Sequence, residues 1–278
     1  MSIKNRFNVF YTVLCTDFKK SHIADVRKQN KDKDMIDLRL GDCLEIMKEI
    51  PSKSIDAIIC DLPYGTTQCK WDSVIDFEPL WKQYNRIIKN NGAIILFGAE
   101  PFSSALRMSN IKNYKYDWVW EKTKASNYLN AKRQPLRANE NISIFYKKQP
   151  IYNPQMTKGN PYNKGKAKRE TSVYGKQVSV EVKSENGLRY PRNVIKFRTA
   201  ESEGKLHPTQ KPLELLEYLV KTYSNENDII LDNTMGSGTT GVACKNLNRK
   251  FIGIEKDEKY FKIAESRINS HVIQGGFF

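Results

Sequence analysis

The sequence is poor in the residues that bind metals or form disulfides. Three His are spread over its 278 residues, and the five Cys form no Cys-x-x-Cys pair. These cysteines are Cys15, Cys43, Cys60, Cys69 and Cys244. Their odd number and their scatter predict reduced thiols in a cytoplasmic protein, and they argue against a zinc cluster or a disulfide framework.

Long hydrophobic runs are also missing. No apolar stretch approaches the roughly 18 residues of a membrane-spanning helix, so we predict no membrane anchor. The apolar stretch 7–15 is interrupted by Asn8 and lacks a small-residue cleavage site, so we do not expect a signal peptide either.

Acidic residues are in deficit, and the deficit is local. The chain carries 46 Lys and Arg against 31 Asp and Glu, a formal net charge of +15. Residues 147–198 alone contain 13 Lys and Arg but three Glu, with Tyr152, Tyr162, Tyr174 and Tyr190 interleaved. Positive charges with aromatic side chains between them suit phosphates and splayed bases, so we predict a nucleic-acid surface here. A solvated charge run without a partner is the alternative.

Strand-like and helix-like patterns alternate on both sides of this basic segment. Strands are expected at 36–40, 55–60, 93–97, 116–120, 142–146, 229–231 and 251–254, and helices at 43–50, 81–89, 212–223, 240–247 and 257–268. Asn90-Asn91-Gly92 is expected to end the second helix. This alternation predicts an α/β fold with a doubly wound, mostly parallel sheet, interrupted at 150–205, where only short β-like runs such as 178–182 occur.

A glycine turn follows one of the expected strands. Asp232 ends that strand, Gly236-Ser237-Gly238 comes next, and Glu255 ends the following strand. Glycines let the backbone approach a ligand, the helix N-terminus offers free N–H groups, and a carboxylate at Glu255 can accept both hydroxyls of a ribose. The pattern predicts a nucleoside ligand, either a nicotinamide dinucleotide or S-adenosylmethionine. Asp232 favours the second, because that molecule carries an ammonium group.

A second turn presents a carboxylate and an aromatic ring together. Asp61-Leu62-Pro63-Tyr64 directly follows the apolar run 55–60. In an open parallel sheet, ligands bind at the carboxyl ends of the strands, so Asp61 and Asp232 should meet at one edge.

This turn suits the exocyclic amine of a nucleobase. The lone pair of such an amine is delocalised into the ring, so the nitrogen is a poor nucleophile. Two acceptors, the Asp61 carboxylate and the Leu62 carbonyl, can hold its two N–H bonds and favour a pyramidal nitrogen. Tyr64 can stack on the base, which is worth roughly 1–3 kcal/mol and is comparable with the cost of extruding a base from a duplex.

With these motifs the sequence resembles the β class of the DNA amino-methyltransferases over about residues 36–270. That family has an Asp-Pro-Pro-Tyr catalytic motif first, then a target-recognition region, then a glycine motif for the methyl donor, and this chain has the same order. The stretch His207-Pro208-Thr209-Gln210-Lys211-Pro212 is similar to the family's helix-start motif, and 118–122 and 139–146 are similar to its later sheet segments.

The resemblance implies a Rossmann-like methyltransferase fold of permuted order. Residues 1–35 would be an N-terminal extension, 36–149 the catalytic half, 150–205 the target-recognition insert and 206–278 the half that binds S-adenosylmethionine.

The resemblance also implies roles for individual residues. Asp61, Leu62, Pro63 and Tyr64 would form the amine and base site. The donor would be held by Asp232, Gly236, Ser237 and Gly238 at its methionyl part, by Thr209 and Lys211 near its carboxylate, by Glu255 at its ribose and by Asp42 near its adenine. An ordinary helix N-cap is the alternative for Asp42.

Two positions depart from the family pattern. Leu62 replaces the first Pro of the catalytic motif, which leaves the backbone carbonyl in place but makes the turn less rigid. Thr234 stands where the family has an aromatic residue, so the apolar contact to the donor is in doubt.

In that family an Asp-led motif indicates adenine N6 and a Ser-led version indicates cytosine N4, although the two sets overlap. Methylation of a cytosine ring carbon is excluded, because it needs a Cys nucleophile, usually after Pro, and the chain has no Pro-Cys pair.

We therefore expect a site-specific DNA methyltransferase that acts on adenine N6 in double-stranded DNA. The same chemistry on cytosine N4 or on RNA, a catalytically silent DNA-binding subunit, and a nicotinamide-dependent oxidoreductase are the alternatives. A homodimer and a cognate restriction nuclease stay open as partners. We expect no bound metal.

Overall fold

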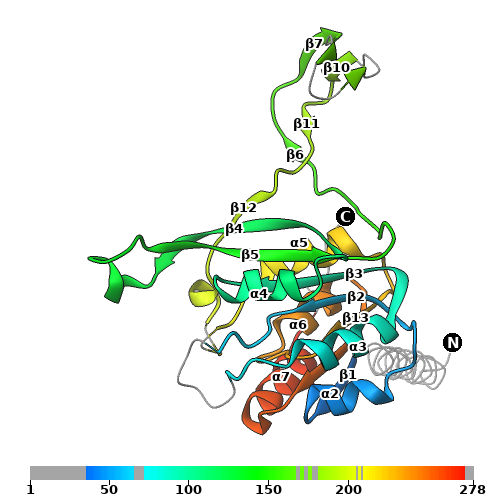
Figure 1. Cartoon of the computed structure of the whole chain (residues 1–278), viewed down its shortest axis with the longest axis vertical. Helices are drawn as coiled ribbons and strands as arrows, with labels where there is room; N and C mark the ends of the chain where they lie inside the picture. The colour runs from blue at the N-terminus through cyan, green and yellow to red at the C-terminus, as the bar shows by residue number, and fades with distance from the viewer. Residues whose placement is uncertain are drawn as a thin grey trace, which may run out of the picture.

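A twisted sheet lies at the centre of the computed structural model, which describes residues 36–65, 72–166, 170–171, 175–176, 181–204, 206–207 and 209–272 (Figure 1). Its strands are β1 (Ile36–Leu40), β2 (Ile55–Cys60), β3 (Ile88–Gly98), β4 (Tyr114–Ser126), β5 (Arg137–Phe145), β12 (Val194–Phe197), β13 (Ile229–Asp232) and β14 (Lys250–Glu255). Their order across the sheet is β1-β14-β13-β2-β3-β5-β4-β12. The predicted N-terminal extension lies outside the described residues.

Every neighbouring pair in the sheet is parallel except those that involve β5. Strand β5 runs antiparallel to both β3 and β4, and β12 then pairs parallel with β4 at the edge. The predicted doubly wound, mostly parallel sheet is confirmed. The chain leaves the sheet after β5 and returns to it at β12, which lies within the segment 150–205.

Helices cover both faces of the sheet. They are α2 (Cys43–Ile46), α3 (Phe77–Ile87), α4 (Phe102–Ser109), α5 (Leu213–Tyr223), α6 (Thr239–Asn246) and α7 (Glu258–Ser270), with 3-10 turns η1 (Met47–Glu49), η2 (Tyr128–Asn130) and η3 (Ala200–Glu203). Side chains alternate across β2, so Ala57 and Ile59 pack with α5, α6 and α7, whereas Ile58 and Cys60 pack with α2, α3 and α4. This alternation is why the buried strand is apolar at nearly every position.

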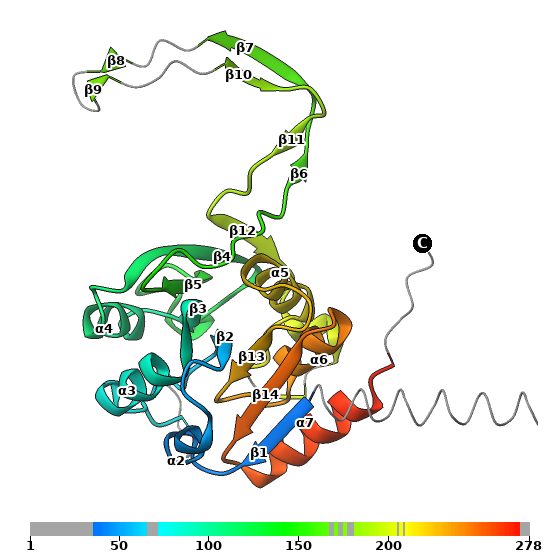
Figure 2. The same cartoon turned by 90° about the vertical axis from the view of Figure 1, so that its right-hand side faces the viewer.

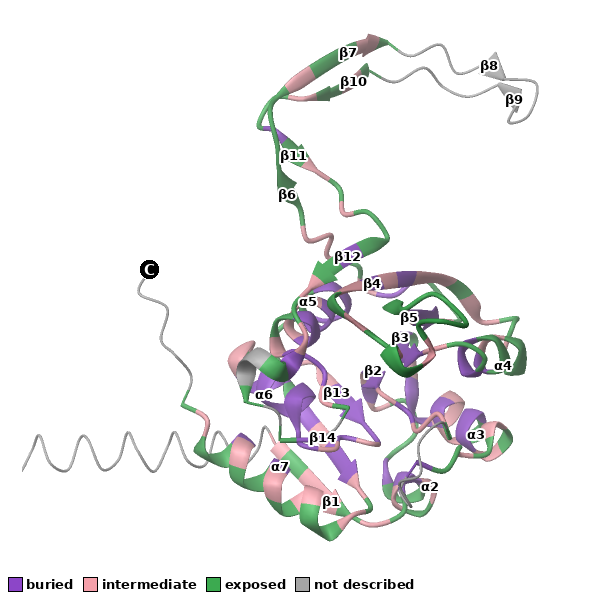
Figure 3. Ribbon diagram, turned by 90° about the vertical axis from the view of Figure 1, so that its left-hand side faces the viewer, coloured by how far each residue is buried: buried purple, intermediate pink, exposed green. Residues whose placement is uncertain are grey.

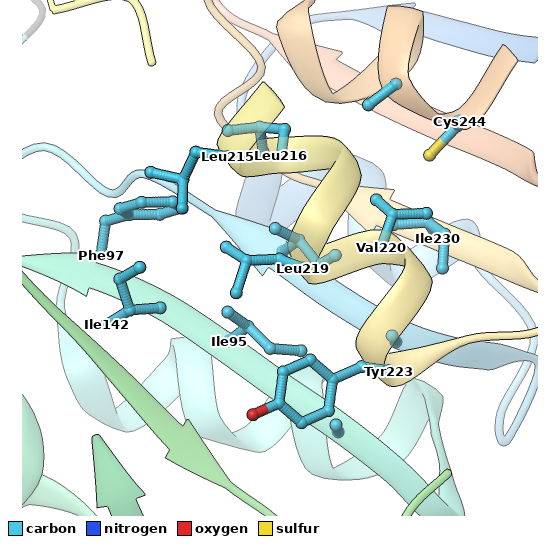
Figure 4. Close-up of a cluster of buried hydrophobic side chains, with 14 of the residues drawn as sticks. Ile95, Phe97, Ile142, Leu215, Leu216, Leu219, Val220, Tyr223, Ile230 and Cys244 are labelled. Atoms are coloured by element: carbon cyan, nitrogen blue, oxygen red, sulfur yellow. The ribbon is translucent and has the colours of Figure 1, made fainter. Parts of the chain in front are cut away.

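The largest cluster lies between α5 and the sheet (Figure 4). Leu215, Leu219 and Tyr223 of α5 pack there against Ile95 of β3 and Ile142 of β5, and all five are buried. Each fully buried side chain of this size contributes about 1.5–3 kcal/mol. The cluster joins segments from both sides of the basic insert into one core.

The predicted end of a helix at residues 90–92 is wrong. Helix α3 begins after Asp76, which accepts a hydrogen bond from the Glu78 amide at 3.1 Å, and it ends at Ile87. Gly92 lies within β3, where the register with β2 shifts between Ile88 and Ala93, and a Cβ there would stand 2.7 Å from the Asp56 carbonyl oxygen. The glycine is therefore required by a close backbone approach at an irregular strand pairing, which is a pattern that sequence reading confuses with a helix stop.

The basic insert forms an arm that projects from the body (Figure 2). Its short strands are β6 (Thr157–Lys158), β7 (Tyr162–Lys166), β8 (Glu170–Thr171), β9 (Gly175–Lys176), β10 (Glu181–Ser184) and β11 (Leu188–Arg189), paired antiparallel as β6–β11, β7–β10 and β8–β9. Figure 3 shows its described part as largely exposed. Of the run 178–182, residues 178–180 lie outside the described residues, and Val182 lies in β10.

The interleaved tyrosines of this segment have different surroundings. Tyr152 packs against Tyr223 with ring centroids 6.2 Å apart, and the Arg189 guanidinium lies 4.2 Å from the centre of the Tyr162 ring. Tyr190 is 76% exposed. Tyr174 lies outside the described residues. Tyr190 is therefore the described tyrosine of this set that is best placed to meet a nucleic acid.

No helix in the described part of the chain is long and apolar enough to cross a membrane. The described residues likewise contain no group of three or more His, Cys, Asp or Glu that could hold a metal ion.

Candidate active site

A cavity of about 870 Å³ opens at the carboxyl edge of the sheet. The predicted site residues come to it from segments far apart in the sequence, because the carboxyl ends of parallel strands meet at one edge. The cavity is lined by Asp42, Asp61, Leu62, Pro63, Tyr64, Thr209, Lys211, Asp232, Gly236, Ser237 and Glu255. Gly238 is the one predicted site residue that does not line it.

The glycine turn and Glu255 are joined by hydrogen bonds. Gly236 adopts a φ of +53° and donates its amide to Glu255 Oε2 at 2.9 Å, while the Asp257 amide donates to Oε1 at 2.8 Å. Burial raises the pKa of Glu255, and these amides oppose the shift. The carboxylate is thus held in one orientation beside the turn, with lone pairs left to accept the hydroxyls of a ligand.

Asp232 is buried at the end of β13. Its Oδ2 accepts from Thr240 Oγ1 at 2.6 Å, and its Oδ1 accepts from the Thr234 amide at 3.1 Å. Burial raises the pKa of Asp232 to about 7. A buried carboxylate without a cationic partner in the described structure is suited to a ligand that brings its own positive charge.

Asp42 caps the short helix α2 and lines the mouth of the cavity. Its Oδ1 accepts from the Leu44 amide at 2.9 Å, and its Oδ2 lies 3.4 Å from Lys256 Nζ. The N-cap alternative raised by the sequence is therefore present in the structure. Asp42 also lines the cavity, so capping the helix does not prevent it from contacting a ligand.

Gly238 contributes to helix packing. It adopts a φ of +77° at the start of α6, and a Cβ there would stand 2.9 Å from Ile268 Cδ1 and 3.0 Å from Ala264 Cβ, both on α7. Its place in the motif is thus explained by the close approach of two helices. The sequence pattern does not separate this role from ligand binding.

We expect Gly238→Ala to lower the free energy of unfolding by about 2 kcal/mol or more, because left-handed strain and overpacking add up. Gly204→Ala is the matched control, since Gly204 has the same φ of +77° but no described residue has an atom within 4 Å of its Cβ position. The control should cost about 1 kcal/mol. Denaturant unfolding measures both variants, and equal losses would contradict the packing role.

Side-chain contacts hold the turn at Asp61–Tyr64. Tyr64 donates its hydroxyl to Asp61 Oδ1 at 2.6 Å, and its ring lies 4.9 Å from that of Phe102. Gly65 follows with a φ of +67° and donates its amide to Asp72 Oδ1 at 2.9 Å. The bend presents Asp61 and Tyr64 together on the cavity wall, as the sequence predicts.

A chain of alternating charges ends at Asp61. Lys211 Nζ lies 2.5 Å from Asp61 Oδ2 and 3.3 Å from Glu140 Oε2, and Lys122 Nζ lies 3.2 Å from Glu140 Oε1. The Lys211 side chain is 9% exposed, so its ammonium needs these carboxylates as partners. The structure thus places Lys211 at the Asp61 carboxylate, whereas the resemblance implies a place near the donor's carboxylate.

The protonation of this group follows from burial and from the ion pairs. Burial raises the pKa of Asp61, although Lys211 opposes the shift. Burial alone would lower the pKa of Lys211 and raise that of Glu140. The ion pairs outweigh burial, so the pKa of Lys211 is raised and the pKa of Glu140 is lowered. The pKa directions therefore favour a protonated Lys211 and an ionised Glu140.

Glu140 and Lys122 are site residues that sequence reasoning missed. Glu140 lies within β5, two residues before the buried run that starts at Ile142, and it reaches the carboxyl edge because β5 is antiparallel. An acidic residue next to a buried strand was the available signal, but its position depends on strand direction, which the sequence does not show.

Gln210 is a third missed residue, and it bears on the fit of the methyl donor. Its Oε1 accepts from Ser237 Oγ at 3.2 Å, while its Nε2 is buried and makes no hydrogen bond with the described residues. A buried N–H donor on the cavity wall suits a carboxylate, as Asp232 suits an ammonium. Together with Glu255 for the ribose, these groups fit S-adenosylmethionine, and the volume is ordinary for a ligand of that size.

Comparison with known proteins identifies the family. A DNA methylase family model, N6_N4_Mtase, matches residues 55–266. The chain is 30% identical over 267 residues to the Type II methyltransferase M.HinfI of Haemophilus influenzae, covering 82% of this chain and 67% of that one. It is 29% identical over 269 residues to M2.LlaDCHI of Lactococcus lactis subsp. cremoris, covering 84% and 90%.

Solved structures give the same result. The crystal structure of an M1.HpyAVI–SAM complex is similar with a TM-score of 0.59 and 30% identity, covering 84% of this chain and 100% of that one. The cytosine-N4-specific PvuII DNA methyltransferase shares the fold, with a TM-score of 0.60, 16% identity and coverage of 86% and 89%. A nicotinamide-dependent oxidoreductase is thereby excluded. The chain belongs to the β class of the DNA amino-methyltransferases, and its methyl donor is S-adenosylmethionine.

Proposed function

We propose that the chain methylates the exocyclic N6 amine of adenine at specific sites in double-stranded DNA, after the base has been flipped out of the duplex. The observation that carries the proposal is the position of Asp61 and Tyr64 on the wall of the cavity that also contains Asp232 and Glu255. An acceptor for an amine and a ring for a base thus share one cavity with the groups that suit the donor.

Asp61 and the backbone of Leu62 would align the amine. In the structure both Asp61 oxygens have partners, Tyr64 on Oδ1 and Lys211 on Oδ2. When Tyr64 stacks on the base, the hydrogen bond from its hydroxyl to Asp61 Oδ1 breaks. The amine then donates one N–H to Asp61 Oδ1 instead. The Leu62 carbonyl accepts the second N–H, which leaves the nitrogen lone pair free to react.

The remaining residues would hold the donor and manage the proton. Asp232 would hold the donor's ammonium, Gln210 and Thr209 its carboxylate, and Glu255 its ribose. S-adenosylmethionine would supply an electrophilic methyl group, whose bond to the positively charged sulfur breaks as its bond to the amine nitrogen forms, leaving a neutral thioether. The amine proton would leave as positive charge develops on nitrogen, and Asp61, whose pKa is raised by burial, would accept it through the Oδ1 that holds the N–H.

The choice of adenine is supported by the Asp-led motif and is tested by product identity. Purified protein is incubated with labelled S-adenosylmethionine and mixed-sequence duplex DNA, and the nucleosides are separated by mass after digestion. We expect adenine methylated on its exocyclic nitrogen. Cytosine methylated on its exocyclic nitrogen would be consistent with the mechanism but would reject adenine as the target base. If a parallel incubation with RNA gave the only labelled product, DNA would be rejected as the substrate.

The arm and the partners follow from the same proposal. The basic arm, with the exposed Tyr190, would recognise the target sequence. A cognate restriction nuclease is an expected partner, because two similar proteins are named Type II methyltransferases. A homodimer stays a prediction, and the mass of the purified protein in solution tests it.

Donor binding should depend on pH through Asp232. Its pKa of about 7 means that the carboxylate is mostly ionised at about pH 8 and mostly protonated at about pH 6. A cationic ammonium needs the ionised form, so the Kd for S-adenosylmethionine should rise about tenfold from about pH 8 to about pH 6.

The free protein should respond to pH in the opposite direction. Because the folded pKa of Asp232 is raised, folding holds a proton that the unfolded chain releases, so stability falls as pH rises from about 4 to about 7. Calorimetric titration and thermal unfolding over this range test both effects. Asp232→Asn should remove the pH dependence of binding, and an unchanged dependence in that variant would reject Asp232 as the ammonium partner.

A further inference from the structure

The turn between β4 and β5 exposes apolar side chains. We call residues 127–137 the hairpin tip. Within it Tyr128 is 75% exposed and Leu129 is 87% exposed. Tyr128 and Leu129 are adjacent in the chain, so they form one exposed apolar surface on a protruding tip, which is a candidate contact site for a partner.

The tip is a folded turn that holds these side chains outward. Asn127 adopts a left-handed φ of +70°, and its Oδ1 accepts from Asn130 Nδ2 at 2.7 Å. The Ala131 amide donates to the Tyr128 carbonyl at 3.1 Å, and the Arg133 amide donates to the Asn130 carbonyl at 2.8 Å. Because the backbone is already ordered, little conformational entropy is lost when the tip binds something.

The charge around the tip has one sign. Between Glu121 and Glu140 the sequence contains five Lys and Arg and no acidic residue. Lys122 and Lys124 are paired with Glu140 and Glu201. Lys132, Arg133 and Arg137 are exposed and form no ion pair with the described residues. This surface is complementary to a polyanion.

The tip also adjoins the catalytic cavity. Ser126, Asn127 and Tyr128 line the same cavity as Asp61 and Tyr64. Figure 1 shows β4 and β5 running out together beyond the body to this tip. A duplex whose target base enters the cavity would therefore contact Tyr128 and Leu129 beside the position that the flipped base has left.

We propose that the hairpin tip is a DNA wedge: Tyr128 and Leu129 enter the duplex beside the target nucleotide, while Lys132, Arg133 and Arg137 bind the flanking phosphates. The inference rests on the proposed flipping of the target base. Extruding a base leaves its neighbours unstacked, and an apolar or aromatic side chain in the gap recovers part of the lost stacking. The phosphate contacts hold the tip in place without reading sequence.

The test compares a paired target with one that is already unstacked. Tyr128→Ala/Leu129→Ala is assayed on a duplex that contains the mapped site, and on the same duplex with an abasic position opposite the target. We expect kcat/KM to fall at least about tenfold on the paired duplex and to recover to within about threefold of wild type on the abasic one. Lys132→Gln/Arg133→Gln should instead weaken binding to both duplexes and lower the slope of log Kd against log salt by about 2.

Met108→Ala is the matched control, because Met108 is 69% exposed on α4 and does not line the cavity. It should match wild type on both duplexes, and donor affinity and unfolding temperature should be unchanged in all variants. Equal losses of kcat/KM on the paired and abasic duplexes, or no loss on either, would overturn the wedge. The wedge would also be overturned if the double variant changed the oligomeric mass of the protein but left the ratio of kcat/KM on the paired and abasic duplexes unchanged. The tip would then be an interface between copies of the chain.

The identity of the base is measured separately in the wild type. A methylated cytosine would reject the proposed adenine specificity and leave the comparison of paired and abasic duplexes applicable to that base.

Discussion

Asp61→Ala should lower kcat by about 10²–10³-fold or more while S-adenosylmethionine still binds. The substitution removes the acceptor for the amine N–H. It leaves untouched the groups that suit the donor, since Asp232, Glu255 and Gln210 lie on other segments. Lys211 keeps Glu140 as a partner at 3.3 Å, so the variant should fold.

The measurement combines single-turnover methylation with calorimetric titration of the donor. Asp37→Ala is the control, because Asp37 is a surface carboxylate paired with Arg39 at 2.8 Å and does not line the cavity. The control should keep full turnover. Near-normal turnover in Asp61→Ala, with intact donor binding, would reject the proposed alignment of the amine.

Lys211→Met should lower the free energy of unfolding by about 3 kcal/mol near neutral pH. It leaves Asp61 and Glu140 partly buried without the cation between them. Their folded pKa values rise, so the folded state holds protons that the unfolded chain releases, and stability falls as pH rises. The deficit against wild type should therefore be small at about pH 5 and largest at about pH 8.

The same substitution should move the pH dependence of turnover. Asp61 accepts the amine only when ionised, so a higher pKa shifts the acidic limb of kcat to higher pH. Denaturant unfolding at several pH values and a pH–rate profile measure the two effects. Lys196→Met is the control, because its pair with Glu121 is exposed and should contribute about 0–1 kcal/mol. An unshifted acidic limb in Lys211→Met would mean that Lys211 has only a structural role.

Much of the sheet was predictable because its strands carry local signals. The run 55–60 is apolar at nearly every position, and β2 has the same bounds. Gly92 shows where this fails, because a glycine required by a close backbone approach has no local mark that separates it from a helix stop. The antiparallel direction of β5 was equally hidden, since strand pairing is decided by partners distant in the sequence.

The candidate site shows the same division. The turn at Asp61–Tyr64 and the turn at Gly236 were identified because each follows an apolar strand, and parallel strands end at one edge. The partners of Asp61 were not identified from the sequence, because Lys211 and Glu140 come from other segments and only the packed core brings them together. Gly238 belongs to a recognisable motif, yet its closest neighbours are on α7.

The sequence by itself determined the α/β class, the order of the motifs and the two turns that contain Asp61 and Asp232, because these depend on local patterns. Only the tertiary structure decided that Lys211 and Glu140 lie beside Asp61, that Gln210 lines the cavity and has a buried Nε2 without a partner among the described residues, and that the β4–β5 tip contributes to the cavity wall. The physical reason is that burial and ion pairing are properties of residues brought together by folding. A sequence shows which charges exist, and the fold decides which of them must be paired.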